Sequence, residues 1–178
     1  MKVLVTGAYG FVGRNLVEKL KESTDYKLTL IDKDDSKEDL VKGILSADFI
    51  FHLAGVNRPE REEEFFEGNS GLTGEIIKIL KDNKKTTPLL ISSSIQAELD
   101  NPYGKSKKKA EEEVFSYGKE AGARVYVYRL PNVFGKWCRP NYNSAVATFC
   151  HNIARDEEVW VSDPSKEMNL VYIDDVVR

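Results

Sequence analysis

Short apolar runs typical of buried strands alternate with longer stretches of helical spacing along most of the chain. Runs rich in valine, isoleucine and leucine predict strands at residues 2–6, 27–31, 48–53, 88–92 and 124–129. Between and after them, apolar positions recur every three or four residues, which predicts helices at residues 11–21, 37–45, 60–81, 103–121 and 144–154. This alternation favours an α/β fold, a Rossmann-type doubly wound parallel sheet with helices on both faces.

The C-terminal third is less regular. A short strand is predicted at residues 158–161, and loops at 136–143 and 162–169. Residues 171–178 have a strand-like start followed by what matches the first turn of a helix. A single helical turn is not stable alone. We therefore expect residues 1–178 to be one domain, C-terminally truncated from a longer polypeptide.

Composition and charge narrow the class of protein. The 178 residues suffice for one domain with a substantial core, and 26 basic against 29 acidic residues give no reason to expect a nucleic-acid partner. The apolar runs are too short to span a bilayer, and the N-terminus does not resemble a signal peptide, so no membrane association is expected. Two cysteines, Cys138 and Cys150, indicate no disulfide framework and fit a cytoplasmic protein. No further ligand stands near Cys150–His151, so no metal site is expected.

A glycine-rich turn lies between the first predicted strand and helix. Gly7, Gly10 and Gly13 occupy the positions where a dinucleotide-binding turn needs a tight bend, close backbone approach to the pyrophosphate, and close packing of helix on strand. The following helix N-terminus offers free N–H groups to phosphates. We expect the cofactor to contact residues throughout this turn, namely Gly7, Tyr9, Gly10, Phe11, Val12 and Gly13.

Two charged residues end the second predicted strand. Asp32 lies 19 residues after Gly13, where a carboxylate can accept hydrogen bonds from the adenosine ribose and would repel a 2′-phosphate. Lys33 follows and could contact that phosphate. Asp32 thus indicates NAD, whereas Lys33 leaves NADP open.

Tyr103 and Lys107 stand four residues apart in a predicted helix, so their side chains share one face. A nearby cation is expected to lower the pKa of the phenol towards a useful range for proton transfer. The basic residues 105–109 are followed by acidic residues 111–113, a pattern that predicts opposite charges on neighbouring turns. Together with the glycine turn and the serine run at 92–94, the pair indicates nucleotide-dependent redox chemistry.

Six motifs in order resemble the extended short-chain dehydrogenase/reductase family of nucleotide-sugar epimerases, dehydratases and reductases. They are Thr6–Gly13, His52–Gly55, Ser92–Ser94, Tyr103–Lys107, Arg129–Gly135 and Tyr172–Val176. Segments 52–59, 92–97, 100–107 and 134–143 are more closely similar to the reductase domains of the bifunctional capsular-polysaccharide enzymes of UDP-N-acetyl-L-fucosamine synthesis. The short loop between Ser94 and Tyr103 also favours this reductase branch.

The resemblance implies a UDP-2-acetamido-2,6-dideoxy-hexos-4-ulose reductase that uses NADPH or NADH, with NADPH slightly favoured. It implies a homodimer formed through the helix that carries Tyr103, and a cupin domain further along the polypeptide. Ser94, with Ser93 in reserve, Tyr103 and Lys107 would be catalytic, and Leu53, Ala54 and Gly55 would lie near the cofactor. The residues expected to bind the UDP-sugar are Asn57, Arg58, Asn132, Trp137 and Arg139. His52 and Asn69 are expected to be structural.

Two alternatives stay open. One is an epimerase or dehydratase of the same family. A dehydratase needs an acid and base pair just after the serines, and residues 95–98 contain only one acidic side chain, Glu98. The other is a non-catalytic NAD(P)-binding regulatory protein, which has no need of Ser94, Tyr103 and Lys107 together.

Overall fold

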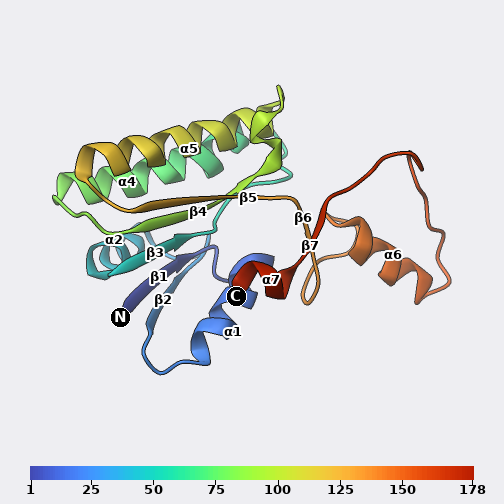
Figure 1. Ribbon diagram of the computed structural model, residues 1–178, viewed down its shortest axis with the longest axis horizontal. Helices are drawn as coiled ribbons and strands as arrows, with labels where there is room; N and C mark the ends of the chain where they lie inside the picture. The colour runs from blue at the N-terminus through green and yellow to red at the C-terminus, as the bar shows by residue number, and fades with distance from the viewer.

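A parallel five-stranded sheet forms the centre of the computed structural model, which describes residues 1–178 (Figure 1). Its strands, in the spatial order β2-β1-β3-β4-β5, are β1 (Lys2–Thr6), β2 (Lys27–Ile31), β3 (Phe49–His52), β4 (Leu89–Ser94) and β5 (Val125–Leu130). Thr6 is level with Ile31 on one side and with His52 on the other. The loops after these strands therefore begin at one edge, and the order of the strands reverses at β1, where open α/β sheets bind ligands. The predicted fold class is confirmed.

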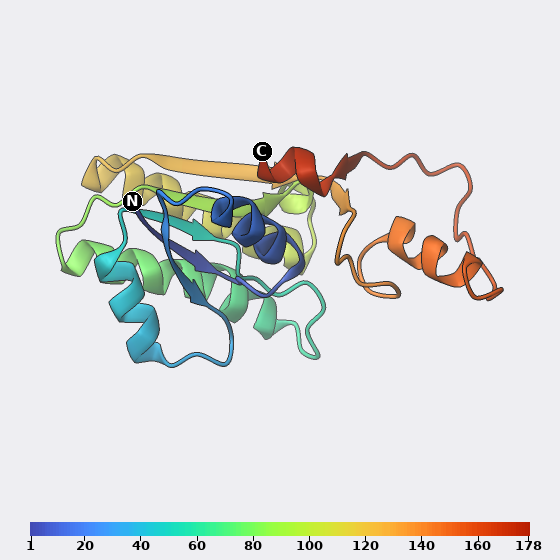
Figure 2. The same ribbon diagram turned by 90° about the horizontal axis from the view of Figure 1, so that it is seen from below.

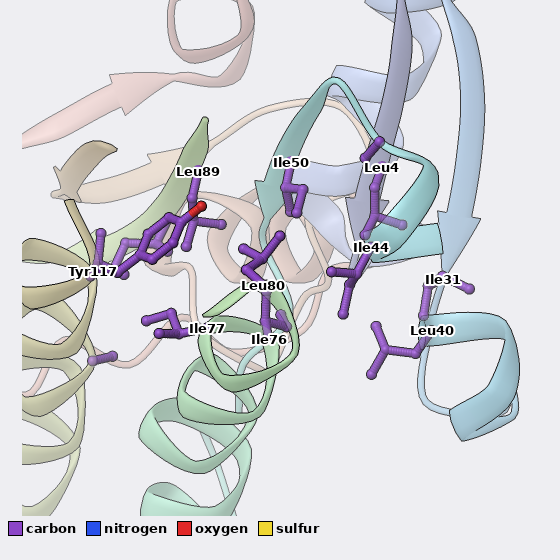
Figure 3. Close-up of a cluster of buried hydrophobic side chains, with 14 residues drawn as sticks. Leu4, Ile31, Leu40, Ile44, Ile50, Ile76, Ile77, Leu80, Leu89 and Tyr117 are labelled. Carbon is purple, nitrogen blue, oxygen red and sulfur yellow. The ribbon is translucent and has the colours of Figure 1, made fainter. Parts of the chain in front are cut away.

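Helices cover both faces of the sheet. On one face lie α2 (Lys37–Ser46), α4 (Leu72–Asp82) and α5 (Pro102–Ala121), and on the other α1 (Phe11–Lys21) and the short α7 (Ile173–Val177). The larger core lies beneath α2, α4 and α5, where side chains of β1, β3 and β4 meet those of the helices (Figure 3). Fully buried members include Leu4, Ile44, Ile50, Ile76, Leu80, Leu89 and Tyr117. Burying each such aliphatic side chain contributes about 1.5–3 kcal/mol.

Local signals fix the ends of α5, the longest helix. Asn101 precedes it, and the Asn101 side chain accepts a hydrogen bond from the Gly104 N–H at 2.7 Å. Pro102 occupies the first turn, where its missing N–H is no loss. Gly122 ends the helix in the left-handed conformation, with a φ of 68°. Tyr103 is thereby held in the first turn.

The predicted helix at 60–81 forms as three joined pieces. A short α3 (Glu63–Phe65) and a π-helical turn η1 (Phe66–Gly71) lead into α4. Asn69 lies in the widened turn and is 2% exposed. Its side chain exchanges two hydrogen bonds with the Val56 backbone, at 3.0 and 3.1 Å, and donates a third to Ser106 at 2.9 Å. Asn69 thus joins the loop after β3 to α5, a structural role as expected.

The C-terminal segment departs most from the sequence-based expectations. A second, two-stranded parallel sheet, not predicted, pairs β6 (Asn132–Phe134) with β7 (Leu170–Tyr172). Between them α6 (Ala145–Ile153) lies apart from the main sheet, as both views show (Figure 2). The strand predicted at residues 158–161 is wrong, because no neighbouring strand pairs with it and Trp160 is 74% exposed. No helix of the chain combines the length and the apolar character that a membrane span needs.

Candidate active site

A cleft of about 610 Å³ opens at the edge of the sheet where β1, β3 and β4 end. It brings together the glycine turn, the loop after β3, the serine end of β4, the start of α5 and the segment that follows β5. The predicted site residues that line it are Gly7, Tyr9, Gly10, Phe11, Val12, Gly13, Leu53, Gly55, Asn57, Ser94, Tyr103, Lys107, Asn132, Trp137 and Arg139. Four others, Asp32, Lys33, Ala54 and Arg58, do not line the cleft.

The glycine turn is shaped by close backbone packing. Gly7 has a φ of 68°, and a Cβ there would lie 2.6 Å from the Ala54 backbone nitrogen. A Cβ on Gly13 would lie 2.0 Å from the Gly7 carbonyl oxygen. Gly10 is different, because its Cβ would meet only that same oxygen, at 3.2 Å. Packing therefore requires Gly7 and Gly13, and Ala54 acts as the support beneath Gly7.

The first turn of α1 faces the cleft with its backbone N–H groups unused by side chains. Gly10 is the N-cap residue and makes no side-chain cap. The N–H groups of Phe11, Val12 and Gly13 begin the helix, where such groups lack partners within the helix. The turn and the helix end together can hold a diphosphate, so the residues present fit a dinucleotide.

Asp32 is joined to the glycine turn although it lies outside the cleft. Its carboxylate accepts hydrogen bonds from the Tyr9 N–H at 2.9 Å and from the Lys33 N–H at 2.8 Å. Thr6 of β1 and Ile31 of β2 are paired in register, so the residues that follow them, Gly7 and Asp32, lie at the same edge of the sheet. The Lys33 side chain forms no ion pair and is exposed.

Lys107 is the most buried charged group that lines the cleft. It is 8% exposed, and its amine donates to the Ser92 carbonyl oxygen at 3.2 Å. Burial lowers the pKa of Lys107 to about 8, while the Glu111 carboxylate acts in the opposite direction. Lys107 therefore stays mostly charged at neutral pH but loses its proton within the alkaline range.

The expectation that the pKa of Tyr103 is lowered is wrong for this structure. Burial raises the pKa of the Tyr103 phenol, with an offsetting effect from the Ser94 hydroxyl and a further rise from Tyr142. The Lys107 amine lies 5.9 Å from the centre of the Tyr103 ring and is bonded to Ser92 instead. The phenol is consequently protonated at neutral pH, the state that a proton donor needs.

The structure distinguishes the two candidate serines. The Ser94 hydroxyl accepts a hydrogen bond from the Gln96 N–H at 3.1 Å, which leaves its proton free for another acceptor. The Ser93 hydroxyl instead donates to the buried carboxylate of Glu111. Ser94 is therefore the serine whose hydroxyl can serve a ligand beside Tyr103.

Sequence reasoning missed an ion pair behind these residues, formed by a buried carboxylate and a partly exposed guanidinium. Glu111 is 3% exposed, and Arg129 of β5 donates to it through Nε at 2.9 Å and Nη2 at 2.6 Å. Arg129 also pairs with Glu98 at 2.6 Å. The interpretation of residues 111–113 as partners of the preceding lysines is thus wrong for Glu111. The available signal was the spacing, because Glu111 follows Lys107 by the same four residues that separate Lys107 from Tyr103.

Aromatic and basic side chains gather on the loop between β6 and α6. The Arg14 guanidinium lies 4.6 Å and the Lys136 amine 4.1 Å from the centre of the Trp137 ring. Asn15 of α1 donates to the Lys136 carbonyl oxygen at 3.0 Å, which ties this loop to the first helix. Arg14 also lines the cleft and was not predicted.

A second group on this loop joins it to the loop after β3. The guanidinium groups of Arg58 and Arg139 lie 5.4 and 5.5 Å from the centre of the Tyr142 ring. Arg58 also donates to the Asn143 side chain at 2.9 Å. Arg58 therefore lies beside two cleft residues, Tyr142 and Asn143, that sequence reasoning missed.

His52 is buried between two threonines. Its Nδ1 lies 2.7 Å from the Thr6 hydroxyl and its Nε2 lies 3.0 Å from the Thr73 hydroxyl. Burial, and to a smaller extent the charge of Lys107, lowers the pKa of His52 to about 3. The ring is therefore neutral at physiological pH and cross-links β1, β3 and α4, in keeping with a structural role.

Comparison with known proteins shows the family. Residues 3–178 match the NAD dependent epimerase/dehydratase family. The chain is 57% identical over its full length to a UDP-2-acetamido-2,6-beta-L-arabino-hexul-4-ose reductase from Pseudomonas aeruginosa, of which it covers 48%. It thus spans about half the length of this curated relative.

Solved structures show the same fold. The capsular polysaccharide assembling protein CapF from Staphylococcus aureus matches 99% of this chain at a TM-score of 0.88 and 50% identity, with 48% of its own chain covered. A UDP-glucuronic acid 4-epimerase from Bacillus cereus, in complex with UDP-glucuronic acid and NAD, matches 99% of this chain and 71% of its own at a TM-score of 0.87 and 20% identity. The chain belongs to the NAD dependent epimerase/dehydratase family.

Proposed function

We propose that this protein reduces the C4 ketone of a UDP-linked 2-acetamido-2,6-dideoxy-4-keto sugar, using NAD(P)H, in the synthesis of capsular or surface polysaccharide precursors. One observation carries the proposal: the glycine turn and the side chains of Ser94, Tyr103 and Lys107 line the same cleft. The substrate class is supported by the reductase from Pseudomonas aeruginosa and the capsular polysaccharide protein from Staphylococcus aureus.

The chemistry divides between the cofactor and the protein. When bound, the reduced nicotinamide supplies a hydride to the C4 carbon. Tyr103 gives its phenolic proton to the C4 oxygen, which converts the ketone to an alcohol and leaves a phenolate. Ser94 donates a hydrogen bond to the same oxygen and stabilises the negative charge that develops there. Solvent then returns the proton to Tyr103.

The charge of Lys107 would offset part of the effect of burial, which raises the pKa of the Tyr103 phenol. Below its own pKa of about 8 the amine is charged, and a cation 5.9 Å from the centre of the Tyr103 ring favours the ionised product of proton transfer. Its buried position also allows it to hold a ribose hydroxyl of the cofactor.

The cofactor is NADP(H) or NAD(H), with NADPH slightly favoured by the resemblance. Gly10 supports a bound dinucleotide, because packing within the protein does not by itself require a glycine at this position. An added Cβ would have one near contact, the Gly7 carbonyl oxygen at 3.2 Å. Asp32, held beside Tyr9, favours a free ribose 2′-hydroxyl, whereas the exposed Lys33 side chain can reach a 2′-phosphate. A comparison of KM for NADPH and NADH in the wild type and in Lys33→Ala tests the choice.

The sugar nucleotide would bind across the loops that follow β3 and β5. Arg58 and Arg139 have no carboxylate within 4 Å, so both charges are available to a diphosphate. Asn57, Asn132 and Trp137 line the same cleft and would contact the sugar or the uracil.

A dehydratase is less well supported. The only acidic side chain just after the serines, Glu98, is paired with Arg129 at 2.6 Å. That pairing takes it away from the role of a second acid or base.

We also propose a cytoplasmic homodimer formed through α5, whose outer surface carries Phe115 at 55% exposure. Sedimentation of the wild type and Phe115→Ser tests the dimer.

The test of the function is oxidation of NADPH or NADH by the purified protein with a UDP-4-keto-6-deoxy sugar, with Tyr103→Phe as the matched control. We expect cofactor oxidation in proportion to the alcohol formed, and loss of most turnover in the variant. Full turnover in Tyr103→Phe would exclude the proposed acid. Release of a dehydrated or epimerised sugar without net cofactor oxidation would exclude the reductase.

A further inference from the structure

We propose that Glu111 is a positioning residue of the active site, which holds the serine end of β4 and the charge of Lys107 in their working arrangement. The proposal rests on the proposed function, because it assigns Glu111 a part in the same reaction. Glu111 is not predicted to touch the substrate or the cofactor.

The helix places Glu111 in line with the catalytic pair. Tyr103, Lys107 and Glu111 follow one another at intervals of four residues, so all three lie along one face of α5. Lys107 and Glu111 are both buried, at 8% and 3% exposure. One stripe of the helix thus carries the phenol, the amine and the carboxylate towards the sheet.

The sheet presents two partners to this carboxylate. Ser93 of β4 and Arg129 of β5 are directly paired across the strands, so their side chains lie on the same face. Glu111 accepts from the Ser93 hydroxyl and from two nitrogens of Arg129. It therefore fastens α5 to both strands at the level of the catalytic serines.

This attachment lies between the two contacts that matter for catalysis. Ser92 gives its carbonyl oxygen to the Lys107 amine, and Ser94 places its hydroxyl beside Tyr103. Ser93 stands between them in the chain, so a shift of its backbone moves both neighbours. Misplacement of reacting groups by about 1 Å can cost about a hundredfold in rate.

Stability alone does not explain a buried carboxylate at this position. Glu111 is 3% exposed, whereas the side chain of its partner Arg129 is 39% exposed. Burying a carboxylate costs free energy of hydration, and attraction to a partner that water screens offsets this cost only in part. A role in the site accounts for a carboxylate buried one helical turn from Lys107.

The charges around Lys107 show what Glu111 contributes. From α5 it is faced by Tyr103 and Glu111, from β3 by the neutral His52, and from β4 by the Ser92 carbonyl. Arg129 stands behind the Glu111 carboxylate. Glu111 is the one anion among these groups, and it raises the pKa of Lys107 against the effect of burial.

The experiment measures the titration of the Lys107 amine by NMR of 13C-lysine-labelled protein, with the signal assigned by its loss in Lys107→Met. Glu111→Gln should move the midpoint down by about one pH unit, and Arg129→Gln should move it up. A disturbance of packing alone has no reason to give shifts of opposite sign. The control is Glu112→Gln, an exposed neighbour that should leave the midpoint unchanged.

Activity supplies the second measurement. Glu111→Gln should lower kcat about 10- to 100-fold, with little change in KM for the cofactor, and should move the alkaline limb of the pH profile to lower pH. Unchanged Lys107 titration in both Glu111→Gln and Arg129→Gln would overturn the proposal. If Glu111→Gln does not fold, Arg129→Gln alone tests the proposal. An upward shift of the Lys107 midpoint supports it, and an unchanged midpoint overturns it. Absence of reductase activity in the wild type would refute the proposed function, while the titration would still test the position of Glu111.

Discussion

The two sides of the cleft are built in different ways. On the side of β1 and α1, Gly7 and Gly13 are dictated by backbone packing, and a single added carbon would lie 2.0 to 2.6 Å from its neighbours. On the side of β4 and α5, the properties of Tyr103, Lys107 and Glu111 depend on burial and charge. The first side is a matter of shape and the second of electrostatics.

Substitutions on the two sides should therefore have different consequences. Where the backbone leaves no room for a side chain, as at Gly7 and Gly13, a substitution should lower cofactor binding and the free energy of unfolding together. An electrostatic site can be changed by degrees, and its failures should depend on pH. Four substitutions, two with a matched neighbour, separate these behaviours.

Gly13→Ala should have the largest effect. Its Cβ would lie 2.0 Å from the Gly7 carbonyl oxygen, so either the turn or α1 must shift. We expect a loss of about 2–4 kcal/mol in the free energy of unfolding and no measurable cofactor binding, by urea titration and calorimetry. Gly10→Ala, whose Cβ has a nearest contact of 3.2 Å, should fold normally and bind cofactor more weakly. Equal stability of Gly13→Ala and the wild type would contradict a steric origin.

Tyr103→Phe should affect rate alone. The phenyl ring keeps its packing against Phe65, whose ring centre lies 5.6 Å away, while the proton donor is lost. We expect kcat to fall about 10²- to 10⁴-fold, with the thermal midpoint and cofactor affinity close to wild type. A comparable fall in cofactor affinity would show that Tyr103 shapes the nucleotide site as well.

Lys107→Met should lower activity and raise the free energy of unfolding at pH 7. Burial lowers the pKa of Lys107 from 10.5 to about 8, so the unfolded chain binds more protons between these values and wild-type stability rises with pH there. Removing the buried charge should abolish that rise and stabilise the fold at pH 7 by up to about 3 kcal/mol. Urea unfolding at pH 7 and pH 9.5 measures both effects. The exposed neighbour variant Lys108→Met should show neither, and a destabilised Lys107→Met would contradict the cost of burial.

His52 should give the smallest effect at neutral pH, because its contribution is confined to acid pH. Its pKa of about 3 lies below the ordinary 6.5, so the unfolded chain takes up a proton first as pH falls below 6.5. Wild-type stability should therefore decline by up to about 1.4 kcal/mol per pH unit from this group. His52→Gln should show a shallower decline between pH 6.5 and 4.5, by urea titration. Identical slopes would show that His52 does not titrate as a buried neutral ring.

Much of the shape-based side could be predicted from the sequence. The glycine spacing and the apolar runs specified the turn, and the bounds of β1, α1 and β2 agree with the prediction. These features depend on residues close together in the chain. The short β6 escaped notice because its partner β7 lies 38 positions further along, and the wrong strand at 158–161 had local propensity without any partner.

The electrostatic side could be predicted only in part. The spacing of Tyr103 and Lys107 identified the pair, but the direction of the Tyr103 pKa depends on burial and on where the amine points. The sequence predicts Glu111 only as one of three acidic residues opposite the preceding lysines, because a run of acidic residues does not tell which one is buried. Its partner Arg129 lies on another strand, and only the register of β4 and β5 brings the two together.

The most direct test follows a labelled hydride. The wild-type protein is given a UDP-4-keto-6-deoxy amino sugar and reduced cofactor carrying deuterium at the transferable position of the nicotinamide, and the product is examined by NMR. We predict one deuterium on C4 of the sugar for each cofactor oxidised, with a free hydroxyl on that carbon. Deuterium at any other carbon, or a product without deuterium, would contradict hydride transfer to the C4 ketone in this cleft.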